Sequence, residues 1–293
     1  MSATRLRWAV NLRELEKSTH FEAYYRTGVQ CVTEKEYEEH RRFVYRDDSL
    51  ACLVSRLLAR QFAVTTTNSD WNRVVIARTE RGKPFVESPS SAHQFNISHH
   101  GEYVVLASDS KHRIGVDVMR VDMDRGETAD SHRQKMKNLF TVGEHAYMEK
   151  QTTEIDKWRA FYRVWCLKEA ILKATGIGLV KDLRTIDFTL DETTSHLPGR
   201  YLLDTQCTEN GQPLDEYVFE EHYIDDNHPV AVGTSFEDIA RAKEARKAFQ
   251  TSPNNFEPLG WERLLQGTQC LNMLPDSGIA AFDELSLKEL KPF

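Results

Sequence analysis

The most informative stretch of this chain is WCLKEAILK, at residues 165–173. Trp165, Glu169 and Lys173 follow one another at intervals of four residues, and residues at i and i+4 lie on the same face of a helix. Phe161 precedes them at the same spacing, so this face is also apolar. A carboxylate and an ammonium on an apolar face point toward the interior or a cleft. An isolated Glu–Lys pair more commonly decorates a solvated surface, so the other motifs must decide between the two interpretations.

The composition bounds the class of protein. The chain has 293 residues, 40% hydrophobic and 10% aromatic, which is enough for one large or two ordinary packed domains. Its formal charge of −7 argues against a general nucleic-acid-binding protein. The five cysteines form no CxxC pair and no zinc-ligand spacing, no signal peptide opens the chain, and no apolar run approaches the roughly 20 residues that cross a bilayer. We therefore expect a reduced, soluble, cytosolic protein without a nucleic-acid or membrane partner.

The hydrophobic pattern predicts an α+β fold in which one unit occurs twice along the chain. Alternation over Leu6–Leu12 predicts a half-buried strand, and the apolar spacing of Ser49–Val64 predicts an amphipathic helix. Short strands are predicted at 74–76, 85–86, 95–97, 103–107 and 114–119, with a tight connection at 99–102, and later at 186–190, 217–219 and 230–232. Between these two sets, residues 120–132 are predicted to form a loop.

Two helices are expected in the second part of the chain. Thr141 and Glu144 form a capping box that starts a helix at Val142, and a longer helix runs from about 156 to 175, where glycines stop it. The order of elements predicts two similar halves, residues 1–112 and 113–235. Residues 236–293 are expected to form a helical or irregular extension without an active site of its own. It would pack on the fold, cap it or form a flexible appendage.

An aspartate interrupts the apolar strand Gly115-Val116-Asp117-Val118. A buried carboxylate without a partner is costly, so it requires a cation, a hydrogen-bond network or access to solvent. The ordinary interpretation is an aspartate that binds a nearby backbone amide. The alternative is a metal ligand, with Glu169 as the second carboxylate, because Mg²⁺ takes one or two protein carboxylates and completes its shell with phosphates and water.

Two polar segments precede this strand. Asn96–Gly101 places Ser98 and His99 at a strand end, where both side chains have groups that bind phosphate oxygens. Arg78–Pro84 is a basic turn restricted by Gly82 and Pro84, and further arginines, including Arg46, lie upstream. Taken singly, the Ser98–His99 segment is better explained as a polar turn, and the basic segment as solvated surface charge. The chain has neither a Walker loop nor a Gly-x-Gly-x-x-Gly motif.

The ordered combination of these motifs resembles the 4'-phosphopantetheinyl transferase superfamily, in its monomeric, Sfp-type branch. The signature matches are Gly115–Asp117, Phe140–Glu144 and Trp165–Lys173, and the wider resemblance to animal members adds Arg46, Arg78–Pro84 and Asn96–Gly101. It is clear from about residue 43 to 178. The resemblance implies two α+β halves related by a pseudo-twofold axis, with coenzyme A in the cleft between them. It also implies transfer of the phosphopantetheine arm to a carrier-protein serine, with release of adenosine 3',5'-bisphosphate.

The resemblance further assigns roles to residues of this chain. Asp117 and Glu169 would hold Mg²⁺, and Lys173, Ser98 and His99 would bind phosphate oxygens. The pocket for the rest of coenzyme A would be formed by Arg46, Arg78, Arg81, Gly82, Lys83, Pro84 and Asn96. Glu169 is the expected base for the acceptor serine, so Glu169, Lys173, Asp117 and His99 form the expected catalytic set.

One departure and two rivals accompany this interpretation. Met119 stands where many relatives carry a second acidic residue, and its sulfur is a poor ligand for Mg²⁺; we therefore expect two protein carboxylates on the metal and retained activity. The rivals are a Mg²⁺-dependent phosphohydrolase or nuclease, and a non-catalytic coenzyme A-binding regulator. The expected partners are acidic carrier domains of the fatty-acid-synthase or aminoadipate-semialdehyde-dehydrogenase type, acted on by a monomer.

Overall fold

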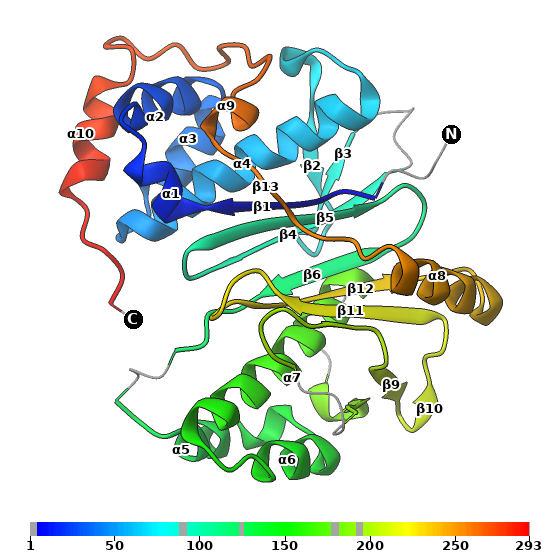
Figure 1. The fold of residues 1–293 in the computed structure, drawn as a ribbon. Coiled ribbons are helices and arrows are strands. Elements are labelled where there is room, and N and C mark those ends of the chain that lie inside the picture. The colour runs from blue at the N-terminus through cyan, green and yellow to red at the C-terminus, as the bar shows by residue number, and fades with distance from the viewer. Residues whose placement is uncertain (1–4, 88–92, 123–125, 177–181, 192–195, 293) are drawn as a thin grey trace.

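The computed structural model describes residues 5–87, 93–122, 126–176, 182–191 and 196–292. It has two α+β halves, one above the other in Figure 1. The sheet of the first half has the strand order β13-β1-β5-β4, in which β13 is Glu257–Pro258, and that of the second half has the order β6-β12-β11-β8, in which β8 is Tyr201–Leu202. The main strands of these two sheets are β1 (Arg7–Asn11), β4 (Gln94–His100), β5 (Tyr103–Asp109), β6 (Ile114–Val118), β11 (Tyr217–Tyr223) and β12 (Pro229–Ser235).

The two sheets repeat one connection pattern. In the first half, β1 pairs antiparallel with β5, which pairs antiparallel with β4. In the second half, β6 pairs antiparallel with β12, which pairs antiparallel with β11. In each half a 22-residue helix lies between the first strand and the hairpin, namely α4 (Arg46–Thr67) and α7 (Glu154–Thr175). The α+β class and the doubled order predicted from the sequence are confirmed.

Smaller elements complete both halves. The first half contains α1 (Leu12–Lys17), α2 (Phe21–Gln30), α3 (Glu34–Arg41), η1 (Trp71–Arg73), β2 (Ile76–Arg78) and β3 (Pro84–Val86). The second half contains α5 (Ala129–Lys135), η2 (Lys137–Leu139), α6 (Val142–Glu149), η3 (Leu183–Thr185), β7 (Ile186–Thr189), β8 (Tyr201–Leu202), β9 (Gln206–Glu209) and β10 (Gln212–Pro213). The predicted loop at 120–132 was wrong at its end, because Thr128 caps a helix that begins at Ala129.

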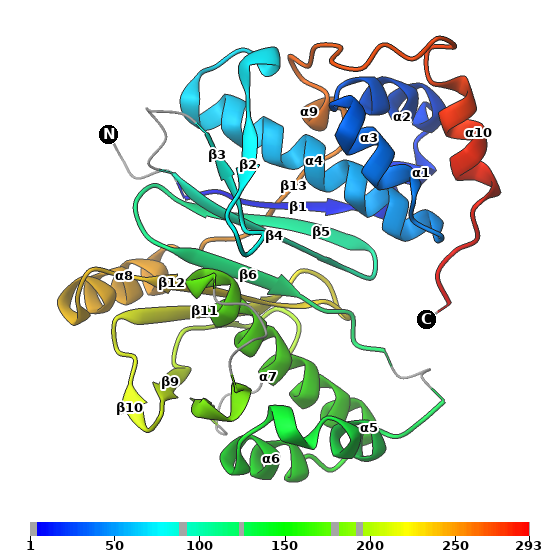
Figure 2. The same cartoon turned by 180° about the vertical axis from the view of Figure 1, so that it is seen from behind.

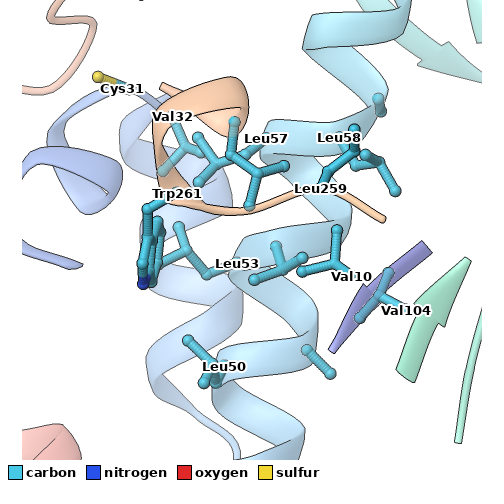
Figure 3. Packing of buried hydrophobic residues seen from close by; sticks show 14 of the residues in the cluster. Val10, Cys31, Val32, Leu50, Leu53, Leu57, Leu58, Val104, Leu259 and Trp261 are labelled. Atoms are coloured by element: carbon cyan, nitrogen blue, oxygen red, sulfur yellow. The ribbon is translucent and has the colours of Figure 1, made fainter. Parts of the chain in front are cut away.

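The core of the first half lies between α4 and its sheet. Leucines of α4 pack against Val10 and Val104 of the sheet and against Trp261 of the C-terminal extension (Figure 3). The helix starts three residues earlier than its apolar pattern predicted, because the first turn is polar, and it ends where Asn68 adopts a left-handed conformation with φ 54°.

The strand β1 is buried on both faces rather than half-buried as predicted. Trp8 and Val10 face the core under α4, whereas Ala9 faces a separate apolar cluster between the two halves. Val105 and Val116 join that cluster from β5 and β6. The pattern Arg-Trp-Ala-Val-Asn looked half-buried because only the tertiary structure shows that a second sheet covers the Ala9 face.

The C-terminal extension packs on the first half, apart from its opening helix. It contains α8 (Ile239–Thr251), β13 (Glu257–Pro258), α9 (Trp261–Leu264) and α10 (Ile279–Leu287). The strand β13 adds a parallel edge to β1, and α10 lies beside α2 (Figures 1 and 2). Trp261 also donates its ring N–H to the Leu15 carbonyl at 3.1 Å. Of the roles expected for residues 236–293, packing is the one observed.

Candidate active site

A hydrogen-bonded network joins the two halves at the centre of the molecule. Lys173 on α7 donates to Asp117 Oδ1 at 2.6 Å and to Ser98 Oγ at 2.9 Å. Ser98 on β4 also donates to Asp117 Oδ1, at 2.8 Å. Three residues from three elements and both halves therefore meet within hydrogen-bonding distance, and the carboxylate of β6 has the cation that burial requires.

Gly115 allows α7 to approach β6 closely enough for this contact. A Cβ atom at this position would lie 2.1 Å from the Ala170 carbonyl oxygen and 2.3 Å from the Ala174 amide nitrogen. No side chain fits that space, so the backbone of the helix rests on the backbone of the strand. This close approach brings Lys173 over Asp117, two residues along β6.

Two carboxylate groups in the site have oxygen atoms without a hydrogen-bond partner among the described residues. Asp117 is 4% exposed, and its Oδ2 is buried without a hydrogen-bond partner. In the described part of the chain, the Glu169 side chain has no hydrogen bond or ion pair either. Burial and the negative charge of Asp117 raise the pKa of Glu169, and Lys173 partly offsets this. Because these oxygens are the hard ligands that Mg²⁺ prefers, the residues fit that ion. Nowhere in the described residues do three or more His, Cys, Asp or Glu side chains gather to hold a metal.

A cavity of about 280 Å³ adjoins the network. It lies between the β2–β3 hairpin, β4 and the C-terminal half of α7. Its lining residues are Arg78, Arg81, Gly82, Lys83, Pro84, Asn96, Ile97, Glu169, Leu172, Lys173 and Gly176. The structure therefore brings together in one cavity most of the residues that the sequence predicted for coenzyme A binding. We call it the cofactor cavity.

The basic turn of the cofactor cavity is held by its own backbone and by Arg78. Gly82 has φ 83°, the left-handed conformation that favours glycine. Arg78 donates to the Gly82 carbonyl at 2.8 Å. Arg81 is exposed and, in the described residues, its side chain has no hydrogen bond or ion pair. The turn therefore presents Arg81 toward solvent and any ligand in the cavity.

Lys83 lines the cofactor cavity and has three partners within the protein. Its ammonium donates to the carbonyl oxygens of Ile114, Lys173 and Ala174 at 3.0, 2.8 and 3.3 Å. Burial lowers the pKa of Lys83 to about 8, with a smaller contribution from Arg113. Lys83 thus ties the hairpin to the C-terminus of α7, and its direct contact with a phosphate stays a prediction.

Three other predicted residues differ in where they lie relative to the cofactor cavity. Asn96 lines it, yet its side-chain oxygen accepts the Val116 N–H at 2.9 Å, which fastens β4 to β6. His99 is exposed and lines a smaller neighbouring cavity. Arg46 does not line the cofactor cavity; it forms an ion pair with Glu16 at 2.6 Å. His100, which had no predicted role, accepts the Arg120 N–H at 2.9 Å.

Sequence reasoning missed the buried pair beneath the site. Lys168 Nζ lies 2.9 Å from a Glu144 carboxylate oxygen, and both side chains are fully buried. The capping box of Glu144 with Thr141 is confirmed, but Glu144 also accepts the Phe188 N–H at 3.2 Å. One signal was available: Lys168 falls on a second apolar face of the helix, where a lysine needs a buried partner.

A larger cavity of about 370 Å³ lies elsewhere in the second half, between α6, α7 and residues 191, 196 and 197. None of the predicted site residues lines it. The residues that the sequence predicted for the site instead gather at the cofactor cavity, which we take as the candidate active site.

Comparisons with known proteins agree with this geometry. A family profile described as the N-terminal part of 4'-phosphopantetheinyl transferase matches residues 19–111, and one described as the 4'-phosphopantetheinyl transferase superfamily matches residues 113–232. The L-aminoadipate-semialdehyde dehydrogenase-phosphopantetheinyl transferase of Homo sapiens is 30% identical over 77% of this chain and 74% of its own length. A phosphopantetheinyl transferase of Thraustochytrium sp. is 32% identical over 77% and 76%, and the 4'-phosphopantetheinyl transferase of Bacillus subtilis is 28% identical over 55% and 68%. The chain therefore belongs to the 4'-phosphopantetheinyl transferase superfamily.

Proposed function

We propose that this protein transfers the 4'-phosphopantetheine group of coenzyme A to a serine of an apo carrier protein. Its relatives in the superfamily are named phosphopantetheinyl transferases. The observation that carries the proposal is the Lys173–Asp117–Ser98 network at the wall of the cofactor cavity. That network offers a cation, a hydroxyl and an unused carboxylate oxygen beside a space large enough for part of a nucleotide.

The proposed reaction is a displacement at phosphorus. The serine Oγ forms a bond to the β-phosphorus of the coenzyme A pyrophosphate, and the bond from that phosphorus to the bridging oxygen breaks. The bridging oxygen leaves with the electron pair as part of adenosine 3',5'-bisphosphate. Glu169 accepts the serine proton, in keeping with its raised pKa and its lack of a hydrogen-bond partner among the described residues.

Positive charge at the cavity wall favours this displacement. The Lys173 ammonium stabilises negative charge on the pyrophosphate, and Ser98 and His99 are the proposed further donors. Arg81 and Arg78 line the cofactor cavity and are the proposed partners of the adenosine bisphosphate end. Arg46 is retained only as an indirect contributor, because its guanidinium already pairs with Glu16.

Mg²⁺ is the proposed metal, with Asp117 and Glu169 as its protein ligands. The fit rests on the buried Asp117 Oδ2, which has no hydrogen-bond partner. Two carboxylates suffice for this ion when a substrate pyrophosphate supplies further oxygens. When bound, Mg²⁺ would neutralise pyrophosphate charge. Met119 lies against the apolar core of the second half, and we do not propose it as a ligand.

One experiment tests the function and separates it from its rivals. The protein is incubated with coenzyme A, Mg²⁺ and an apo acyl carrier protein, and the carrier is measured by intact-mass spectrometry. Transfer adds the phosphopantetheine mass to the carrier. A phosphohydrolase would release free phosphopantetheine without modifying the carrier, and a non-catalytic coenzyme A-binding protein would leave both substrates unchanged.

Two controls accompany that experiment. Chelation of the metal with EDTA should stop transfer, and added Mg²⁺ should restore it. In the Glu169→Gln variant transfer should fall by about 10²- to 10⁴-fold, the usual range for loss of a general base, and calorimetry of coenzyme A binding separates this loss from a loss of affinity. Unchanged transfer by this variant would remove Glu169 from the mechanism.

The setting of the reaction is also a proposal. Acyl carrier domains of the fatty-acid-synthase and aminoadipate-semialdehyde-dehydrogenase types are the proposed acceptors, and a monomer in the cytosol is the proposed active form. All five cysteines are unpaired thiols, as in proteins of reducing compartments. In the described parts of the chain, no helix combines the length and apolar character that crossing a bilayer requires.

A further inference from the structure

Four exposed apolar side chains border the site on the side away from the cofactor cavity. Phe43 and Val44, which precede α4, are 39% and 77% exposed. Leu287 and Leu290, at the end of α10 and just beyond it, are 85% and 52% exposed. We call these four residues the apolar rim. Large apolar side chains that cluster on a surface mark an interaction site more often than scattered ones.

Hydrogen bonds hold the two segments of the rim side by side. Lys288 Nζ donates to the Phe43 carbonyl at 2.6 Å, and the Arg46 N–H donates to the Glu289 carbonyl at 2.8 Å. The Lys291 N–H then donates to Asp47 Oδ2 at 3.2 Å. The C-terminal run in Figure 1 descends from α10 beside α1 toward the second half. The rim is therefore a fixed surface, although its residues are far apart in sequence.

The rim adjoins the catalytic network through a second cavity. That cavity is lined by residues of three segments: Asp47, Asp48 and Ala51 of α4, His99, His100 and Gly101 of the β4–β5 hairpin, and Lys291. Lys291 forms an ion pair with Asp48 at 3.0 Å. The start of α4 and the C-terminal run therefore connect the rim with the wall of the second cavity that faces His99.

The residues of β4 show in which order the two cavities and the catalytic network lie along this strand. Asn96 lines the cofactor cavity, Ser98 contacts Asp117 and Lys173, and His100 lines the second cavity. A strand rises about 3.3 Å per residue, so the two cavities lie on opposite sides of the Ser98 hydroxyl. Coenzyme A in the cofactor cavity leaves the other side, next to the apolar rim, for the acceptor.

We infer that the apolar rim is a docking surface for the carrier domain. This inference rests on the proposed function, because that function requires a serine of a folded protein at the pyrophosphate. A serine hydroxyl is only one bond from Cβ, so the carrier backbone must come close to the network. The carrier surface next to that serine must therefore contact the edge of the site. The partner is a carrier domain with apolar side chains beside its serine. The fully buried core of a protein–protein interface is more apolar than the rest of the protein surface.

The test compares charged substitutions on and off the rim. Val44→Asp and Leu290→Asp are made singly and together, with Met273→Asp as the matched control. Met273 is 86% exposed and lies on the connection between α9 and α10, outside both cavities. All three positions are exposed, so thermal unfolding should match the wild type, and this is checked first.

Transfer is then measured with an apo acyl carrier protein while each substrate is varied in turn. We expect the double variant to raise KM for the carrier at least 10-fold and to weaken direct binding of the carrier by a similar factor. KM for coenzyme A should stay within 2-fold in every variant. A purely structural defect would move both KM values, so this split identifies docking.

The outcomes distinguish the inference from the function on which it rests. If the wild type modifies no apo carrier, the proposed function fails. If the wild type is active and the double variant keeps its KM and affinity for the carrier, the rim is not the docking surface. An equal loss in Met273→Asp would also overturn the inference, because it would show a general response to surface charge.

Discussion

The two long helices occupy equivalent places in the two halves, yet only α7 contributes residues to the cofactor cavity. Both α4 and α7 have 22 residues, and both end in a left-handed residue, Asn68 with φ 54° and Gly176 with φ 69°. The helix α4 packs through leucines against Val10 and Val104. The last turns of α7 present Glu169 and Lys173 instead, over a strand that contains Asp117.

The difference lies in how closely each helix approaches its first strand. On β6, Gly115 removes the side chain that would separate strand from helix. On β1 the corresponding run is Arg-Trp-Ala-Val-Asn, without a glycine. Leucine side chains therefore fill the gap under α4, whereas under α7 the gap closes and a polar network forms beside it. In this protein, a glycine on a strand distinguishes the half in which helix backbone and strand backbone are in contact, and the candidate active site lies beside that contact.

The test with the largest expected effect replaces one buried aspartate in each half with asparagine. Asp117→Asn removes the charge that pairs with Lys173, and we expect kcat to fall about 10³-fold, the upper range for loss of one charge-stabilising group. Asp109→Asn is the matched change, since Asp109 is also buried and pairs with Arg5 at 2.9 Å. That variant should lose stability and keep kcat within 2-fold. Comparable losses of kcat in both would break the comparison.

The second test adds a methyl group at one glycine of each half. Gly115→Ala forces a Cβ against the backbone of α7, so we expect a loss of about 3 kcal/mol in the free energy of unfolding, together with loss of transfer. Gly28→Ala on α2 meets side-chain atoms only, namely Leu57 Cδ1 at 3.3 Å and atoms of Trp261 and Leu53 at 3.6 and 3.7 Å, and it gains helix propensity. Its unfolding free energy should change by less than about 1 kcal/mol. Urea denaturation of both variants measures the difference.

The third test asks whether Lys83 tethers the cavity or binds the ligand. Lys83→Met removes three hydrogen bonds from an ammonium to carbonyl oxygens, so we expect a loss of about 1.5–3 kcal/mol in stability. KM for coenzyme A should also rise several-fold. Arg81→Met should raise KM for coenzyme A without a change in stability, because the Arg81 side chain makes no hydrogen bond or ion pair in the described residues. If Lys83→Met leaves thermal unfolding unchanged, the tether has no structural role.

The smallest expected effect concerns the contact between the hairpin turns of the two halves. His228 Nε2 lies 2.9 Å from Glu102 and its Nδ1 lies 2.8 Å from Asp225. Burial alone would lower the pKa of His228, but the hydrogen bonds and charges of Asp225 and Glu102 outweigh it and raise the pKa above 6.5. The charged form therefore stabilises the fold fully below pH 6.5, and this stabilisation is lost as the pH rises through the folded-state pKa.

The His228→Asn variant measures that contribution. The difference in unfolding free energy between wild type and variant should be largest below pH 6.5 and should shrink as the pH rises through the raised pKa. His222→Asn is the control, since burial lowers the pKa of His222 to about 4 and keeps it neutral over this range. A difference between wild type and His228→Asn that grows with pH would contradict the assignment.

Local patterns in the sequence predicted many of the elements but not their full extent. The capping box of Thr141 and Glu144 started α6 as expected, and Gly176 ended α7. The first turn of α4 and the helix α5 were missed, because both are short and polar and lack apolar spacing. Thr128 caps α5, but no side chain caps the start of α4. The strand β13 was missed as well, since its two residues are ordered by pairing with β1.

The sequence by itself determined the order of the elements, the alignment of Trp165, Glu169 and Lys173 on one helix face, and the family. These depend on spacing within one segment, where helix geometry is fixed by the backbone. Only the tertiary structure decided which groups meet. It brought Ser98 and Asp117 to Lys173, directed Lys83 to three carbonyl oxygens, and paired Arg46 with Glu16. Such contacts join residues far apart in the chain, so they depend on how closely helix and strand pack, which at β6 depends on the absence of a side chain at Gly115.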